Sequence, residues 1–180
     1  MKRSIFLLTL LLMAGVTCIR AEVADSAASG FTYKTMLTLQ APPETVYLRL
    51  LSIANWWSSD HTFSGDAHNL SIEAKPMGCW CEKLPNGGGV RHMQVVRVMP
   101  GKMLVMTGGL GPLQAMAATG SMSFQLSPAD GGTKLEIMYA VTGYAPGGLN
   151  SLSGPVDQVL NEQFKRFRSY VETGSAEGKK

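Results

Sequence analysis

Apolar and polar residues alternate along several stretches of the chain. In residues 31–40, Phe31, Tyr33 and Leu37 share one face of an extended backbone and polar residues occupy the other, which predicts a half-buried strand. Further stretches bounded by turn residues predict six more strands, at residues 70–75, 78–84, 90–99, 102–107, 119–127 and 133–144. The strongest turn signal is Pro-Asn-Gly-Gly-Gly at residues 85–89, which predicts a hairpin.

Two segments carry helical patterns. Residues 42–44, Pro-Pro-Glu, end the first strand and begin a short helix, since proline and acidic residues suit a first helical turn. Residues 155–172 predict one long helix with an apolar stripe that includes Val156, Val159 and Phe164. Consecutive strands joined by short turns pair antiparallel. We therefore predict an α+β, helix-grip-like fold in which a curved seven-stranded antiparallel sheet surrounds the long C-terminal helix and leaves room for a small ligand.

The N-terminus has the pattern of a secretory signal peptide. Two basic residues precede an almost continuous apolar run at residues 4–16, which is shorter than the roughly 20 residues that cross a membrane. We expect residues 1–21 to be a signal peptide cleaved after Ala21, and the protein to be periplasmic or secreted. Lipid attachment at Cys18 is the alternative, disfavoured because Thr17 stands where a small Gly or Ala is usual.

The rest of the chain is expected to form one domain. We expect residues 22–30 to be a polar linker, residues 31–174 the domain, and residues 175–180 a disordered tail. The net charge of +3 is small and its basic residues are scattered, so a nucleic-acid partner is not expected. No other apolar run reaches spanning length, and no nucleotide-binding fingerprint is present. We expect no transmembrane segment after signal removal and no cofactor, while the oligomeric state stays open.

Cysteine and histidine positions leave several possibilities. Cys79 and Cys81 are compatible with two buried thiols, a reducible disulfide or part of a metal site. A polar loop at residues 58–69 holds four potential metal ligands: Asp60, His61, Asp66 and His68. Their spacing matches no established metal motif. Local hydrogen bonding is therefore the favoured interpretation, and we expect no metal.

Several local sequences accompany this order of elements. They are Ala-Pro-Pro-Glu-Thr-Val-Tyr at residues 41–47, Trp56-Trp57, Gly-Cys-Trp-Cys-Glu at 78–82, Val-Arg-His-Met at 90–93, Leu-Gly-Pro-Leu-Gln at 110–114 and Gly-Tyr-Ala-Pro-Gly-Gly-Leu at 143–149. With the closing helix, they resemble an exported bacterial branch of the START/Bet v 1-like (SRPBCC) superfamily, which includes polyketide cyclase/dehydrase-like proteins. The resemblance covers residues 31–174 and implies a helix-grip fold. It implies no particular activity, because such folds host unrelated functions.

The hairpin carries the sharpest catalytic hypothesis. If its turn is centred on Gly87, Glu82 lies opposite His92, and a carboxylate beside an imidazole can orient it for acid–base chemistry. A polar pair on the outer face is the competing interpretation, and a bulge in the glycines would separate the pair. In this register Trp80 and Met93 lie on opposite faces, so which of them points inward stays open.

The remaining candidates line the predicted cavity. Tyr139 shares a strand face with apolar residues, so we expect its ring to line the core or the cavity, with a role as a catalytic acid as the alternative. The apolar loop at residues 108–118 and the glycine-rich residues 147–154 are candidates for gating the cavity mouth. For the apolar loop, the alternative is that it plugs one end of the sheet. Predicted ligand-binding residues are Trp56, Trp80, Met93, Leu110, Leu113, Phe124, Tyr139 and Phe164.

Three functions are compatible with these features. The leading hypothesis is an exported protein that binds a hydrophobic or amphipathic small molecule, such as a lipid or an aromatic metabolite. The second is a cyclase- or dehydratase-like enzyme that uses His92 with Glu82, or Tyr139, on a carbonyl compound. The third is a structural or interaction protein whose cavity is filled by its own side chains. An apolar void favours the first, inward-facing Glu82 and His92 favour the second, and absence of a void favours the third.

Overall fold

The computed structural model describes residues 22–178. The expected signal peptide, with Cys18 and the cleavage site at Ala21, lies outside the described residues. Within residues 22–178, no helix is both long enough and apolar enough to span a membrane. The longer elements are β1 (Glu22–Ala27), β2 (Gly30–Leu39), α1 (Pro43–Leu51), β3 (Leu70–Ile72), β4 (Cys79–Lys83), β5 (Gly89–Met99), β6 (Met103–Gly108), β7 (Ala117–Ala129), β8 (Gly132–Tyr144) and α2 (Asn150–Thr173).

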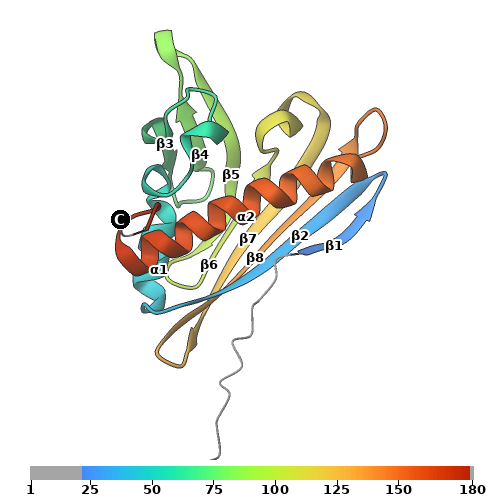
Figure 1. Cartoon of the computed structure of the whole chain (residues 1–180). Coiled ribbons are helices and arrows are strands. Elements are labelled where there is room, and N and C mark those ends of the chain that lie inside the picture. The colour runs from blue at the N-terminus through green and yellow to red at the C-terminus, as the bar shows by residue number, and fades with distance from the viewer. Residues whose placement is uncertain (1–21, 179–180) are drawn as a thin grey trace, which may run out of the picture.

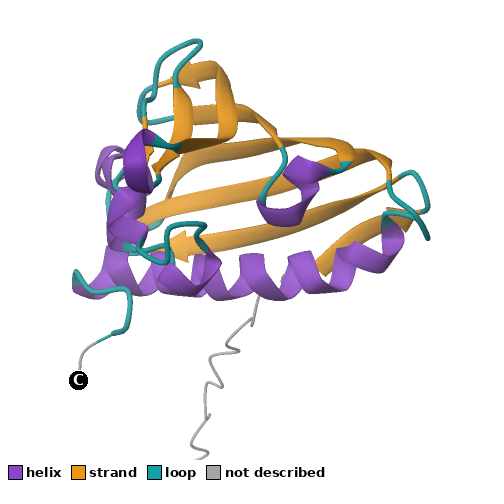
Figure 2. Ribbon diagram, turned by 90° about the horizontal axis from the view of Figure 1, so that it is seen from above, coloured by secondary structure: helices purple, strands orange, loops and turns teal. Residues whose placement is uncertain are grey.

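The strands form one curved antiparallel sheet with α2 on its concave face (Figures 1 and 2). The order across the sheet is β1-β2-β8-β7-β6-β5-β4-β3, so every strand from β3 to β8 lies beside its neighbour in sequence. This arrangement confirms the predicted α+β class and the position of the long helix, and it fits a helix-grip fold. The predicted number of seven strands is wrong, because residues 22–178 form a sheet of eight.

The additional strand, β1, comes from the segment expected to be a linker. Glu22–Ala27 pairs antiparallel with the start of β2, with an irregularity between Val23 and Asp25. The segment is small and polar, and it lacks the alternation that marks a buried face. Backbone pairing with the otherwise open edge of β2 accounts for this strand, and side-chain periodicity does not reveal that kind of pairing.

Helix α2 begins earlier than predicted. We expected Pro155 at its first turn, whereas the helix starts at Asn150 and contains Pro155. It ends at Gly174, which adopts a left-handed conformation with φ of 81° and donates its N–H to the carbonyl of Tyr170 at 3.0 Å. Beyond the helix, the hydroxyl of Ser169 donates to the carbonyl of Ser175 at 2.7 Å.

The two halves of α2 meet different surroundings. In the C-terminal half, Phe167 packs on Trp56 with ring centroids 5.0 Å apart, and Phe164 lies 6.1 Å from Phe124 and 6.2 Å from Tyr33. All five side chains are buried. Large rings therefore fill the space between sheet and helix at this end. The N-terminal half of α2 carries smaller side chains, and the space beside it remains open.

Candidate functional site

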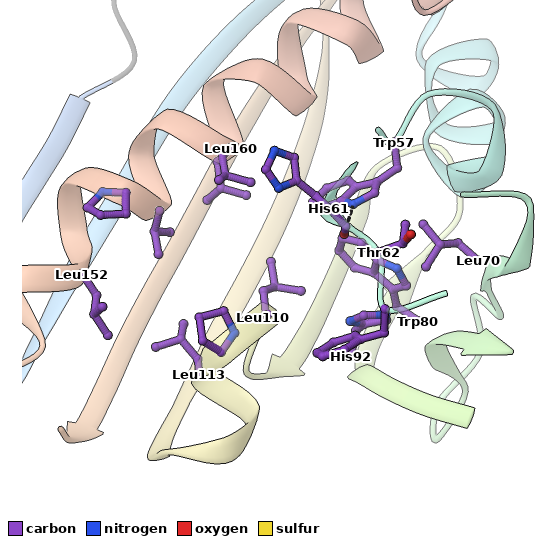
Figure 3. Close-up of a pocket in the computed structure, with 16 residues that line it drawn as sticks. Trp57, His61, Thr62, Leu70, Trp80, His92, Leu110, Leu113, Leu152 and Leu160 are labelled. Atoms are coloured by element: carbon purple, nitrogen blue, oxygen red, sulfur yellow. Dashed lines mark hydrogen bonds between the residues drawn. The ribbon is translucent and has the colours of Figure 1, made fainter. Parts of the chain in front are cut away.

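A cavity of about 460 Å³ lies beside the N-terminal half of α2. The helix contributes five of the residues that line it: Leu152, Pro155, Val156, Val159 and Leu160. Trp57, Trp80 and His92 lie at one end, whereas Leu113 and Leu152 lie at the other (Figure 3). The protein's own side chains leave this volume open, and the atoms that face it are almost all carbon.

The central part of the apolar loop, residues 109–116, lies across from α2 (Figure 2), and four of its residues line the cavity. It connects β6 to β7 and contains a short 3-10 helix, Gly111–Ala115. Leu110 and Leu113 of this loop line the cavity, and Leu113 is buried. The loop therefore forms a wall of the cavity.

Tyr139 anchors the apolar loop. Its hydroxyl accepts the N–H of Leu110 at 3.2 Å and donates to the carbonyl of Gly108 at 3.3 Å. Burial raises the pKa of Tyr139 to about 12, so the phenol stays protonated and keeps both bonds. Its ring covers Gly120, where a Cβ would overlap Tyr139 Cε2 and lie 2.9 Å from the carbonyl oxygen of Ala140. The geometry assigns Tyr139 to holding the loop, since its hydroxyl is engaged by backbone and the residue is not part of the lining.

The β4–β5 hairpin differs from its predicted register. Glu82 pairs with Val90 instead of His92, and Trp80 pairs with Met93. A β-bulge leaves His92 as the extra residue of β5, so the irregularity occurs within the strand and not in the glycine turn. Because of the bulge, the consecutive residues His92 and Met93 are both buried. Trp80 and Met93 therefore do not compete for the inner face, since both are 1% exposed.

Glu82 and His92 nevertheless meet. His92 Nε2 lies 2.9 Å from Glu82 Oε2, and both side chains are buried. The same carboxylate accepts the backbone N–H groups of Phe63, at 3.2 Å, and of Ser64. An ionised carboxylate only accepts hydrogen bonds, so Nε2 of His92 carries the proton. Its Nδ1 faces the side-chain Nε2 of Gln114, a residue of the apolar loop, at 3.3 Å.

Burial and hydrogen bonding set the charges of this pair. Desolvation raises the pKa of Glu82, but the hydrogen bonds from Ser64, Phe63 and His92 outweigh it and bring the pKa below its ordinary value. Desolvation lowers the pKa of His92, and the Glu82 carboxylate opposes this effect without reversing it. At neutral pH, Glu82 is therefore ionised and His92 is neutral.

The lowered pKa of His92 and the lowered pKa of Glu82 both predict a loss of stability in acid. The unfolded chain binds more protons than the folded chain between the ordinary His pKa of 6.5 and the lower folded value of His92. The free energy of unfolding therefore falls as pH drops below 6.5, and Glu82 adds to the loss below its ordinary pKa of 4.5. Urea unfolding measured from about pH 7.5 to about pH 5 tests this. The free energy of unfolding should depend less steeply on pH in His92→Gln than in wild type. In the control His68→Gln, whose histidine is exposed, this pH dependence should be unchanged. An equal pH dependence of the unfolding free energy in wild type and His92→Gln would contradict this prediction.

The predicted ligand-binding residues fall into two groups. Trp80, Leu110 and Leu113 line the cavity, as does the catalytic candidate His92. Outside the lining, the buried core holds the other five: Trp56, Met93, Phe124, Tyr139 and Phe164. Glu82 lies behind the wall, bonded to His92.

Several lining residues were not predicted to bind ligand. They are Trp57, His61, Thr62, Phe63, Leu70, Gly111, Pro112 and the α2 residues from Leu152 to Leu160 named above. The apolar stripe of the predicted helix already contained Val156, Val159 and Leu160. Along this stripe, valine and leucine give way to phenylalanine. This change distinguishes the half of α2 that borders the cavity from the half that packs tightly on the sheet.

The two cysteines are joined. Cys79 and Cys81 form a disulfide, with Cα atoms 5.4 Å apart. Two residues of a regular strand span roughly 6.6 Å, so β4 is contracted between them, opposite the bulge at His92. This geometry selects one of the three interpretations that the sequence left open.

The polar loop is locally hydrogen-bonded. Asp66 accepts the backbone N–H of His68 at 2.9 Å and lies 2.8 Å from its ring Nδ1. His61 Nε2 lies 3.6 Å from Glu162 of α2. Among residues 22–178, no three His, Cys, Asp or Glu side chains are grouped so as to hold a metal ion.

Comparisons with known proteins identify the fold and no more. No family model matches the sequence, and no curated protein matches it. Among solved structures, a protein from Chromobacterium violaceum is 17% identical over 78% of this chain and 96% of its own, with a TM-score of 0.55. The Aha1 dimer from Colwellia psychrerythraea is 17% identical over 79% of this chain and 97% of its own, with a TM-score of 0.55.

A third similar structure is DynU16, from the dynemicin biosynthetic locus. It is 18% identical over 82% of this chain but only 49% of its own, with a TM-score of 0.57. This chain therefore spans about half the length of DynU16. At these identities the similarity shows a shared arrangement of sheet and helix.

Proposed function

We propose that the protein binds a hydrophobic or amphipathic small molecule in the cavity beside α2. The observation that carries this proposal is the lining: of its sixteen residues, only His61, Thr62 and His92 are polar, apart from the ring nitrogens of two tryptophans. Water gains few hydrogen bonds in such a space. An apolar ligand that fills it removes its own surface and that of the wall from water, which favours binding.

The same proposal includes family and location. The arrangement of sheet and helix, together with the local sequences in residues 31–174, supports membership of the START/Bet v 1-like (SRPBCC) superfamily. The N-terminal pattern supports export to the periplasm or beyond, with processing after Ala21 and lipid attachment at Cys18 as the alternative. The Cys79–Cys81 disulfide is compatible with an oxidising compartment.

Filling the cavity tests the function. Val159 lines the cavity and is half-buried, so Val159→Trp should place an indole in the ligand's space and weaken binding at least about tenfold. Binding is measured by fluorescence titration with the neutral apolar probe N-phenyl-1-naphthylamine. Native mass spectrometry of wild-type protein, purified without detergent, should show a retained small molecule that the variant lacks.

The matched control is Lys165→Trp. It adds the same side chain to the same helix at an exposed position, and probe binding should stay at the wild-type level. Equal probe affinity in wild type and Val159→Trp, with both variants folded by circular dichroism, would refute binding in this cavity.

The buried Glu82–His92 pair favours one alternative, a cyclase- or dehydratase-like enzyme acting on a carbonyl compound. The pair lies at the cavity wall, and the carboxylate fixes the tautomer that leaves Nδ1 of His92 unprotonated. If Gln114 moves away, Nδ1 is a base positioned at the ligand space. An enzyme would convert its bound molecule, so wild type and His92→Gln would retain different compounds; a binding protein would retain the same one.

A further inference from the structure

Four rings form one end of the cavity, which we call the aromatic corner: Trp57, Phe63, Trp80 and His92. The rings of Trp57 and Trp80 meet edge to face, with centroids 4.8 Å apart and planes at 83°. His92 lies 5.7 Å from Trp80 and 5.8 Å from Phe63. All four residues line the cavity, and Trp57, Trp80 and His92 lie together in Figure 3. The corner thus presents several aromatic surfaces to one part of the ligand space.

A buried negative charge lies directly behind this corner. The side chain of Glu82 is 0% exposed. Within residues 22–178, His92 is the only basic side chain within ion-pair distance of it. The other groups that bond it are neutral backbone N–H donors of Phe63 and Ser64. With His92 neutral, these hydrogen bonds stabilise the carboxylate but leave its charge without a counter-charge.

The lining does nothing to offset that charge. It contains no lysine or arginine, and its histidines are His61 and His92. The indole N–H of Trp80 has no partner in the described part of the chain, but one neutral donor does not balance a full charge. An anionic head group placed in the corner would therefore lie close to Glu82 without a cation beside it, which is unfavourable in an apolar space.

We propose that the cavity selects an apolar ligand carrying an amine or quaternary ammonium group, which lies in the aromatic corner. A cation over aromatic faces is attracted by their electron-rich surfaces, most strongly by tryptophan, and the attraction grows when water is excluded. The same cation supplies the counter-charge that Glu82 lacks. This inference rests on the proposed binding function, and it adds the chemical class of the ligand.

Three ligands with one tail and different heads test the inference: decyltrimethylammonium, decanol and decanoate. Each competes with bound N-phenyl-1-naphthylamine in wild-type protein at neutral pH, below its micelle concentration and at one fixed ionic strength. Decyltrimethylammonium should bind about tenfold more tightly than decanol, and decanoate should bind most weakly.

Variants place the preference in the corner. Trp57→Leu removes the largest aromatic face beside Trp80, and Glu82→Gln removes the charge; each should bring the ammonium-to-alcohol affinity ratio close to one. Leu152→Ala, at the opposite end of the cavity, should leave that ratio unchanged. A ratio is compared within each variant, so a general loss of affinity or stability does not distort it.

The outcomes separate this inference from the function on which it rests. If none of the three ligands displaces the probe and the probe itself does not bind, the proposed function fails. If the ligands bind with equal affinity, or decanol or decanoate binds most tightly, the binding function stands and the cationic ligand class is overturned. Persistence of the full ammonium preference in both Trp57→Leu and Glu82→Gln would likewise overturn it.

Discussion

Glu82→Ala is expected to destabilise the protein by about 3–5 kcal/mol, because a single carboxylate satisfies three buried or partly buried donors. Alanine would leave the backbone N–H groups of Phe63 and Ser64 and the Nε2–H of His92 without this acceptor. Each unsatisfied buried donor costs roughly 1–3 kcal/mol. The polar loop would also lose its attachment to β4, so the cavity wall should loosen. Urea unfolding followed by tryptophan fluorescence measures the change.

Glu136→Ala is the matched control for this loss. Glu136 lies on β8 and forms an exposed pair with Lys134. Such pairs contribute about 0–1 kcal/mol, so the control should remain close to wild type. A loss below about 1 kcal/mol in Glu82→Ala would mean that water replaces the carboxylate, and would remove Glu82 as the organiser of this wall.

Phe167→Ala is expected to cost about 3–5 kcal/mol. Phe167 is fully buried in the packed half of the molecule, and its ring lies 5.0 Å from that of Trp56. Truncation removes apolar contact area and leaves a hole that neighbouring rings refill only in part. Thermal and urea unfolding should both show the loss, with an unchanged dependence on denaturant concentration if folding stays two-state.

Phe63→Ala removes the same side chain from the cavity rim. Phe63 is 55% exposed, so stability should change by less than about 1 kcal/mol. Comparable destabilisation by Phe167→Ala and Phe63→Ala would contradict the division between tight packing beside the C-terminal half of α2 and an open cavity beside its N-terminal half. The contrast also separates residues that maintain the fold from residues that face the ligand.

Much of the fold follows from local patterns. The alternation in residues 31–40 and 133–144 identified strands that pair with each other in β2 and β8, because a period of two places one set of side chains on one sheet face. The stripe on α2 likewise identified the face that meets the sheet. Strand β1 escaped this reasoning, since its pairing depends on backbone groups and on the open edge of β2.

The candidate site shows the opposite balance. Glu82 and His92 were singled out as a pair from a regular hairpin, and the structure brings them together through a bulge that the regular register does not contain. The expected partition of Trp80 and Met93 between two faces failed for the same reason. One additional residue in β5 changes the orientation of every side chain on one side of it, and composition does not reveal where that residue is accommodated.

The sequence by itself determined the kinds and order of the elements and which face of each is apolar, because these depend on neighbours a few residues away. Only the tertiary structure decided the edge strand β1, the inward turn of His92 onto Glu82, and the cavity beside the N-terminal half of α2. Each of these depends on residues distant in the chain: an unpaired edge, a shifted strand register, and a volume that α2, the apolar loop and the polar loop jointly leave unfilled.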